Sequence, residues 1–285
     1  MVTEANAAGR ATALGRAADG AAAEVVSLWL TPQAASAQVA RRAQVRRTTQ
    51  RRGTLEEFAT VDQFSTCARR EPAIGDHGGP MDAIEAVVFD IGGVLLDWNP
   101  RYLYRELFDD EESMERFLAE ICTMEWHRAN DLGVPYAESC AALAERHPDH
   151  ANMIWAWGRR TEEMIGGPID GTVEILRELL AAGVPCYALT NMEAETYPLR
   201  RDRYDFMRWF AGTVVSSHER VAKPALEIFH RLLERFGLSA PATLLIDDSQ
   251  VNVDAARAVG MQAIRFESPA QVRAQLEQAG LLAGS

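Results

Sequence analysis

The sequence predicts an α/β fold in which a three-layer, Rossmann-like parallel sheet carries a small helical cap inserted after its first strand. Short apolar runs recur from residue 84 onward, and amphipathic segments separate most of them. Parallel strands that are buried on both faces form continuous apolar runs, and helices connect one strand to the next. The chain has 285 residues, of which 47% are hydrophobic and 25% charged, so it can bury a sizeable core.

The first predicted strand, 84–90, is an apolar run that ends in Asp90 and is followed, after Ile91, by two glycines. Similar runs predict further strands at 184–190, 212–216, 243–248 and 262–266. Amphipathic segments predict helices at 170–182, 224–236, 250–259 and 269–279. Gly183 and Gly237 follow two of these helices, as is common at helix C-termini, and Pro224 would occupy the first position of its helix.

The segment 101–165 is rich in helix formers, tryptophan and acidic residues, and it contains no clear strand. We interpret it as the cap, with 81–100 and 166–285 forming the core domain. Trp126, Trp155 and Trp157 are expected mostly in the core of the cap. A cap that closes over a site excludes water and selects the substrate, so substrate choice is expected to reside in 98–165.

Residues 1–80 differ from the rest of the chain, because they are dense in alanine and contain pairs of adjacent arginines. They fit a disordered segment or a non-native extension upstream of a start at Met81, and these interpretations are favoured. An arginine-rich organellar transit peptide is the alternative. No function is assigned to this segment.

Charge and cysteine usage exclude several classes of protein. The net charge of −12 argues against general binding to nucleic acid or to anionic membranes. No run of 18 apolar residues is present, so no transmembrane helix is expected. The four cysteines form no CxxC pair, which argues against a disulfide scaffold or a zinc ribbon. We expect a cytoplasmic monomer or homodimer.

Polar residues stand where the predicted strands end. Asp90 ends the first strand, Thr190 and Asn191 follow the second, and Asp247 and Asp248 end the fourth. In parallel sheets, ligands bind at the carboxyl ends of the strands. Clustered carboxylates repel one another unless a cation joins them, and hard oxygen ligands suit Mg²⁺. Each residue alone has an ordinary explanation as a turn or a helix cap.

Lys223 is the only lysine in the chain, and the other 28 basic residues are arginines. It stands just before the predicted helix at 224–236. An ammonium group and the donors of Thr190 and Asn191 would suit an anion such as phosphate. Mg²⁺, a lysine and a positioned aspartate are the groups needed for phosphoryl transfer. Taken alone, a lysine is usually a solvated surface residue.

Four ordered motifs resemble those of the haloacid dehalogenase (HAD) superfamily of hydrolases. They are FDIGGVLLD (89–97), LTNME (189–193), AKPALEIF (222–229) and IDDSQVN (246–252). The resemblance covers about 84–280 and implies a HAD-like core. The GGV form of the first motif and the helical insertion after it resemble the subgroup that includes sugar-1-phosphate phosphatases. The resemblance is specific for the superfamily and much less specific for the substrate.

The resemblance implies a role for each motif residue. Asp90 would be the nucleophile, which forms an aspartyl-phosphate that water then hydrolyses. Thr190 and the Asn191 amide would hold the phosphoryl group, and Lys223 would bridge Asp90 and the phosphate. The Mg²⁺ ligands would be Asp90, the backbone carbonyl of Gly92, and Asp248, with Asp247 beside them as a further ligand or a supporting group. The substrate would be a small phosphorylated metabolite.

One position departs from the pattern of many phosphatases in this superfamily. A second Asp, two residues after the nucleophile, protonates the leaving group in those enzymes, and here that position is Gly92. The leaving group could be good enough to need little protonation, a cap residue such as His127 could supply the proton, or the hydrolase could be slow or degenerate. For His127, an ordinary surface or core position is favoured over a catalytic role.

Two other functions compete with the phosphatase. A 2-haloacid dehalogenase would use the same Asp90 without Mg²⁺, but the adjacent Asp247 and Asp248 make little sense beside an anionic substrate without a metal. A non-catalytic binding protein of the same fold would explain Gly92 but not the charge cluster. The basic residues Arg200, Arg201 and Arg203 are interpreted as a solvated face, with steering of an anionic substrate as the alternative.

Overall fold

The computed structural model describes residues 83–284, and the interpretations of 1–80 lie outside this part of the chain. Its centre is a five-stranded parallel sheet with strand order β5-β4-β1-β6-β7. The strands are β1 Ala86–Phe89, β4 Cys186–Thr190, β5 Gly212–Val215, β6 Thr243–Asp247 and β7 Gln262–Arg265. The predicted α/β class and all five predicted strands are confirmed, with β1 and β4 each starting two residues later than expected.

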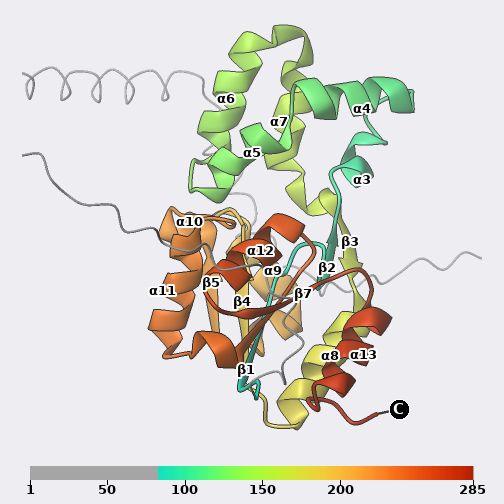
Figure 1. Ribbon diagram of the computed structural model, residues 1–285. Coiled ribbons are helices and arrows are strands. Elements are labelled where there is room, and N and C mark those ends of the chain that lie inside the picture. Colours follow the sequence, from blue (N-terminus) through green and yellow to red (C-terminus); the bar gives the residue numbers. More distant parts are fainter. Residues whose placement is uncertain (1–82, 285) are drawn as a thin grey trace, which may run out of the picture. The chain divides into compact units, whose positions relative to one another are not determined.

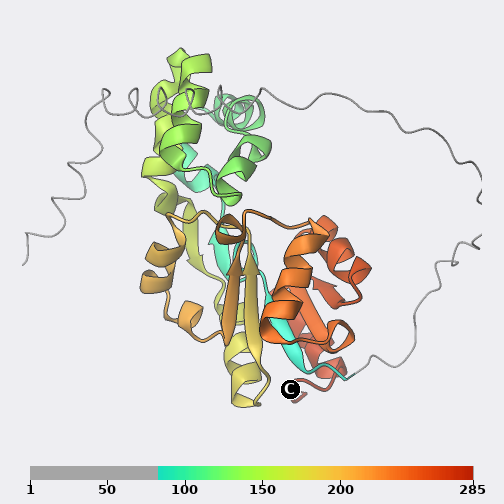
Figure 2. The ribbon, with the colours of Figure 1, turned by 90° about the vertical axis from the view of Figure 1, so that its left-hand side faces the viewer.

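Helices cover both faces of the sheet and give the three layers (Figures 1 and 2). On one face α8 (Asp170–Ala181) and α13 (Pro269–Gln278) pack against alternate residues of the strands, such as Val87 and Phe89. On the other face α11 (Leu226–Phe236) and α12 (Gln250–Ala258) pack against Val88 and Leu245. Because side chains alternate along a strand, each strand supplies both cores.

The helix predicted at 224–236 begins at Leu226, because the residue before it, Ala225, has an extended backbone. It ends as expected, with Gly237 in the left-handed region at φ 64°. Short elements complete this part of the chain: α9 Tyr197–Arg203, η3 Asp205–Arg208, α10 Ser216–Glu219 and η4 Ala240–Ala242.

The segment between β1 and α8 is mostly helical, as predicted, and gathers at one end of the sheet (Figure 1). It contains α3 Arg101–Tyr104, α4 Glu111–Glu120, α5 Met124–Asp131, α6 Tyr136–Arg146, η1 Pro148–His150, α7 Ala151–Arg159 and η2 Thr161–Met164. These helices have a core of their own, in which Tyr104 and Trp157 are fully buried and Trp126 and Trp155 are partly buried. The prediction that these tryptophans belong mostly to a core is therefore confirmed.

The sequence did not predict a second sheet. Strands β2 (Leu96–Trp98) and β3 (Ile165–Pro168) pair antiparallel, with an irregularity between Asp97 and Trp98. They are the two stretches of chain that connect the helical segment to the main sheet. We call this pair the connecting ribbon. Among residues 83–284, no helix is long and apolar enough to cross a bilayer.

Candidate active site

A cavity of about 230 Å³ opens at the carboxyl ends of β1, β4 and β6, where the fold predicts a ligand site. Its floor includes Asp90, Asn191 and Asp248. Residues of the helical segment and the connecting ribbon form other parts of the wall, among them Trp98, Met124, His127 and Asp131. The remaining lining residues are Ile91, Gly92, Gly93, Leu96, Ile165, Met192, Glu193 and Arg200.

Lys223 lies under this cavity and joins two of the predicted carboxylates. Its ammonium Nζ is 2.8 Å from Asp90 Oδ2 and 2.6 Å from Asp247 Oδ2, and the lysine is fully buried. The other oxygen of Asp90 accepts a hydrogen bond from the Ile91 N–H at 2.6 Å. The only lysine of the chain is therefore placed where a compact cation satisfies two buried anions.

The two adjacent aspartates of β6 have different surroundings. Asp247 is fully buried, and its Oδ1 accepts hydrogen bonds from the Ser249 N–H at 3.0 Å and the Asn252 amide at 2.9 Å. Asp248 lines the cavity and lies against the loop after β1, where a Cβ on Gly93 would be 2.6 Å from Asp248 Oδ2. Gly93 also has φ 74°, so this close approach requires glycine.

Burial raises the pKa of Asp90 to about 7; the charge and hydrogen bond of Lys223 lower it, and the charges of Asp247 and Asp248 raise it. Burial also raises the pKa of Asp248, with Asp247 adding to the effect. Although burial lowers the pKa of Lys223, the two bonded carboxylates raise it above its usual value, so the lysine is charged. Three carboxylates face one ammonium, and this part of the site has an excess of negative charge.

Thr190 and Asn191 stand at the end of β4 as predicted, but their side chains are occupied within the protein. The Asn191 amide donates to the Lys223 carbonyl at 3.0 Å, and its oxygen accepts from the Lys223 N–H at 2.9 Å. Thr190 is 1% exposed and does not reach the cavity wall. Asn191 thus holds the backbone of Lys223 in place, and the direct contacts of both residues with phosphate stay predictions.

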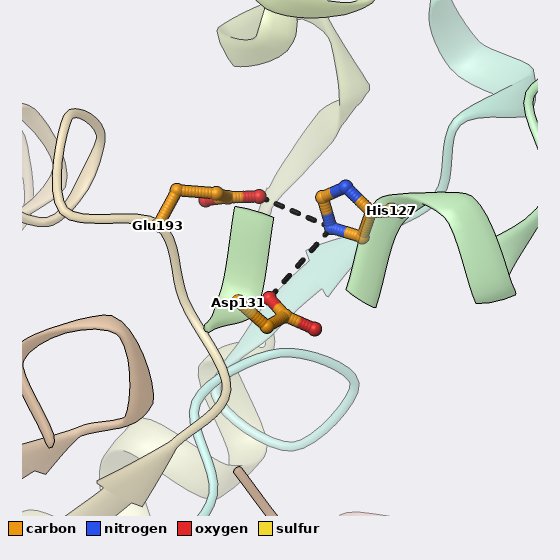
Figure 3. A group of neighbouring side chains, drawn as sticks. All are labelled: His127, Asp131 and Glu193. Carbon is orange, nitrogen blue, oxygen red and sulfur yellow. Dashed lines mark ion pairs between the residues drawn. The ribbon is translucent and has the colours of Figure 1, made fainter. Parts of the chain in front are cut away.

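A second group of buried charges lines another part of the cavity wall, formed by α5 and the loop after β4, and Figure 3 shows its three residues. His127 and Asp131 are one turn apart on α5, and Glu193 follows β4. His127 Nε2 is 3.1 Å from Glu193 Oε1 and 3.8 Å from Asp131 Oδ1. The His127 Nδ1 accepts a hydrogen bond from the Trp157 indole N–H at 3.2 Å.

Glu193 has many partners. Its Oε1 also accepts from the Tyr136 hydroxyl, its Oε2 accepts from the Thr196 hydroxyl, each at 2.6 Å, and Arg200 Nη1 is 3.7 Å from Oε2. Although burial raises the pKa of Glu193, the His127 hydrogen bond and the nearby positive charges lower it far below its usual range. Burial lowers the pKa of His127, but Glu193 raises it, and the pKa lies above its usual value. The pair joins the helical segment to the core.

Both groups contain enough oxygen and nitrogen ligands, within 4.8 Å of one another, to hold a metal ion. The group of Asp90, Asp247 and Asp248 fits a hard divalent cation, because Lys223 compensates only part of its charge and Asp248 is exposed. The group around Glu193 fits one poorly, because both His127 nitrogens are engaged and Arg200 already supplies a positive charge.

The structure corrects the interpretation of Arg200, which is 4% exposed and does not belong to a solvated face. It pairs with Glu162 at 3.1 Å and with Glu193, and part of it lines the cavity. Arg201 is exposed, and Arg203 reaches Glu162 at 3.7 Å.

Sequence reasoning also missed Trp98, Asp131 and Glu193 as residues of the cavity wall. A signal was present for Asp131, since it lies four residues after His127 on a helix and therefore on the same face. His127 itself is buried and lines the cavity, so it is not a surface histidine.

The fold and the order of the charged strand ends define a Rossmann-like hydrolase with a helical insertion. A family model described as "haloacid dehalogenase-like hydrolase" matches residues 84–260, more than half of the chain. The chain therefore belongs to the haloacid dehalogenase-like hydrolases, as its motifs indicated.

Two curated relatives are phosphatases. A sesquiterpene phosphatase, astK, of Aspergillus oryzae is 28% identical over 194 residues, which cover 68% of this chain and 95% of that protein. A phosphorylated carbohydrates phosphatase of Thermotoga maritima is 24% identical over 187 residues, covering 64% of this chain and 84% of that protein.

Solved structures show the same fold. A HAD-like family hydrolase from Porphyromonas gingivalis has a TM-score of 0.54 at 17% identity, covering 68% of this chain and 98% of its own. A HAD family enzyme from Bacteroides thetaiotaomicron, solved as a magnesium complex, has a TM-score of 0.51 at 19% identity, covering 66% of this chain and 95% of its own.

Proposed function

We propose that this hydrolase is a Mg²⁺-dependent phosphatase that removes phosphate from a small phosphorylated metabolite through a phosphorylated Asp90. The observation that carries the proposal is the Lys223 ammonium, which lies 2.8 Å from Asp90 and is fully buried beneath a cavity that Asp248 and Gly92 line. The phosphatase relatives support the same reaction class.

In the first half of the reaction, Asp90 Oδ attacks phosphorus, an oxygen–phosphorus bond forms, and the bond to the leaving oxygen breaks. Lys223 offsets negative charge on Asp90 and on the transferring group. Water then attacks phosphorus, and Asp90 is released as a carboxylate. The Asn191 clamp keeps the Lys223 backbone fixed while this occurs.

The donor set indicates how Mg²⁺ would be held. Asp90, Asp248 and the carbonyl of Gly92 would be direct ligands. Asp247 would act through Lys223, because both of its oxygens already accept hydrogen bonds. When bound, Mg²⁺ would neutralise charge on the phosphoryl oxygens and orient them. It would also favour the ionised form of Asp90, whose pKa of about 7 is otherwise too high for a permanent carboxylate.

The rest of the cavity wall bears on the substrate. Leu96, Trp98, Met124, Ile165 and Met192 supply apolar surface beside the charged floor. We infer that the alcohol part of the substrate has an apolar portion, while phosphate occupies the charged end. The two relatives, named for a sesquiterpene and for carbohydrates, show that phosphatases of this family differ in the alcohol they release.

Phosphate release from a panel of phosphorylated metabolites, measured with Mg²⁺ and with EDTA, tests the proposal. Chloride release from 2-chloropropionate is measured beside it. Mg²⁺-dependent phosphate release is expected, and metal-independent chloride release would replace the phosphatase with a dehalogenase that uses the same Asp90.

Asp90→Asn is expected to lower kcat by at least about 10³-fold without unfolding the protein, because the amide is a poor nucleophile. Asp109→Asn is the matched control, since Asp109 is an exposed aspartate of the helical segment. Wild-type activity in the Asp90 variant would show that the nucleophile is assigned wrongly.

A further inference from the structure

Neither the backbone conformation nor the packing at position 92 requires a glycine, so Gly92 leaves open space in the site. A Cβ at Gly92 would have no atom within 4 Å, and its φ lies outside the left-handed region. Its neighbour Gly93 is the opposite case, since φ is 74° and a Cβ would collide with Asp248. The space beside Gly92 belongs to the cavity, so a group from another part of the chain can face it.

Two of the buried side chains in the second group, His127 and Glu193, have no atom available for a substrate. The nitrogens of His127 face Trp157 and Glu193 at 3.2 and 3.1 Å. The oxygens of Glu193 accept from His127, Tyr136 and Thr196. Proton exchange with a ligand would break a bond that connects the helical segment to the core.

Asp131 differs from both. Within residues 83–284, no N–H or O–H donates a hydrogen bond to its carboxylate, and the ion pair to His127 is long at 3.8 Å. Its side chain is 12% exposed, and Asp131 lines the cavity. Burial raises the pKa of this carboxyl to about 6; His127, Lys223 and Arg128 lower it, and Glu193 raises it. A carboxylic acid that titrates near neutral pH can both give and accept a proton.

The backbone at Asp131 is fixed to the core. The Ser216 hydroxyl donates to the Asp131 carbonyl at 2.7 Å and accepts from the Met192 N–H at 3.1 Å. Two residues further on, Gly133 has φ 92°, and a Cβ there would be 2.9 Å from the Ser217 carbonyl oxygen. The end of α5 is therefore held against α10 and the loop after β4, and the Asp131 carboxyl is held at the cavity.

We propose that Asp131 is the general acid and base of this enzyme and takes over the function of the side chain absent at Gly92. This inference rests on the proposed phosphatase function. As the bond between phosphorus and the leaving oxygen breaks, the Asp131 carboxyl gives its proton to that oxygen. When water attacks the phosphorylated Asp90, the Asp131 carboxylate takes a proton from the water and is restored. The substrates are therefore alkyl phosphates, whose alkoxide leaving groups need a proton.

The test compares first turnovers of the Mg²⁺-loaded wild type and Asp131→Asn with two substrates. One is n-hexyl phosphate, whose leaving group needs a proton, and the other is p-nitrophenyl phosphate, whose leaving group is a stable anion. For the variant we expect hexanol release to slow by about 10²–10³-fold, while the first-turnover burst of p-nitrophenolate changes by less than about threefold. Because the variant cannot activate water, phosphorylated Asp90 should accumulate and be detectable by intact-protein mass spectrometry after acid quench.

Two further variants complete the design. Asp109→Asn, the exposed control, is expected to behave as wild type. In the double variant Gly92→Asp with Asp131→Asn, the space at Gly92 can accept a carboxyl. Recovery of hexanol release by about tenfold or more would support the proposed role of Asp131, because a carboxyl at position 92 would then replace the carboxyl lost at position 131.

Equal slowing of both substrates in Asp131→Asn, or no slowing of either, would overturn the role of Asp131 while leaving the phosphatase intact. Absence of Mg²⁺-dependent phosphate release from the wild type would instead remove the proposed function, and this inference with it. Circular dichroism and thermal melting of each variant separate these outcomes from loss of the fold.

Discussion

Two groups of buried charges border one cavity, and they differ in how completely the protein compensates them. On the floor, Asp90 and Asp247 share the Lys223 ammonium, and within residues 83–284 Asp248 forms no ion pair. In the second group, which we call the wall, Glu193 has both His127 and Arg200 within 4 Å. The floor therefore keeps an excess of negative charge, which a ligand cation can neutralise, whereas the wall is almost neutral. Buried charges without full compensation are typical of reactive sites, whereas buried charges that are paired, as on the wall, join parts of a fold.

The largest effect is expected from Lys223→Met, which removes the cation of the floor while keeping most of the side-chain volume. Asp90 and Asp247 would then be buried next to each other without a cation, which costs about 3–5 kcal/mol. Chemical denaturation should show this loss, and phosphatase activity should fall below detection. A variant with wild-type stability would mean that the floor is not held together by this ammonium.

The matching change on the wall is Glu193→Gln, for which we expect a loss of about 3 kcal/mol. Because the pKa of Glu193 is depressed in the folded protein, its ionised carboxylate stabilises the fold above the pKa of an unfolded glutamate. This stabilisation is lost as the pH falls from there through the folded pKa. Because the pKa of His127 is raised in the folded protein, the protonated imidazole stabilises the fold at low pH. This stabilisation is lost as the pH rises through the folded pKa of His127. Urea titrations should therefore show the largest penalty near pH 5–6, and a penalty independent of pH would contradict the pairing.

Mg²⁺ distinguishes the two groups directly. At one hundred times its Kd, Mg²⁺ should stabilise the wild type by about 2.7 kcal/mol, because it binds only the folded state. Asp248→Asn should lose most of this gain, while Glu193→Gln should keep it. Melting temperatures with EDTA and with increasing Mg²⁺ measure both effects. Loss of the gain in Glu193→Gln together with its retention in Asp248→Asn would place the cation on the wall.

Asp131→Asn should stabilise the protein while impairing its reaction. The raised pKa of Asp131 means that the folded state binds its proton more tightly, so the ionised group lowers stability as the pH rises above about 4. This pKa shift corresponds to about 3 kcal/mol. We expect Asp131→Asn to raise the free energy of unfolding by about 2 kcal/mol at pH 8, since the asparagine side chain is also poorly hydrated at this buried position. The gain should vanish near pH 3.5, and a gain that does not depend on pH would contradict the account.

Most of the core and of the floor could be predicted from the sequence, because both depend on short patterns of neighbouring residues. The apolar run 84–90 ends directly in Asp90, and the adjacent Asp247 and Asp248 end another run. The wall could not be predicted in this way. His127 and Glu193 are 66 residues apart, and only the packing of the helical segment brings them together.

Two other failures have different physical causes. Arg200 was interpreted as solvated because neighbouring arginines usually are, but its burial depends on the distant Glu162. The connecting ribbon escaped detection because β2 has three residues and β3 contains Gly166 and Gly167, which gives no strand pattern.

The connecting ribbon has a mechanical consequence. Both crossings of the chain between the helical segment and the main sheet lie side by side in one two-stranded ladder. A ladder bends and twists far more easily than it shears, because shear breaks its hydrogen bonds. The ribbon therefore allows the helices to tilt as one unit only where the contacts of His127, Tyr136 and Asp131 with the core open, and it opposes sliding across the sheet. Because Trp98 belongs to this ribbon and also lines the cavity, each tilt would move one wall of the site.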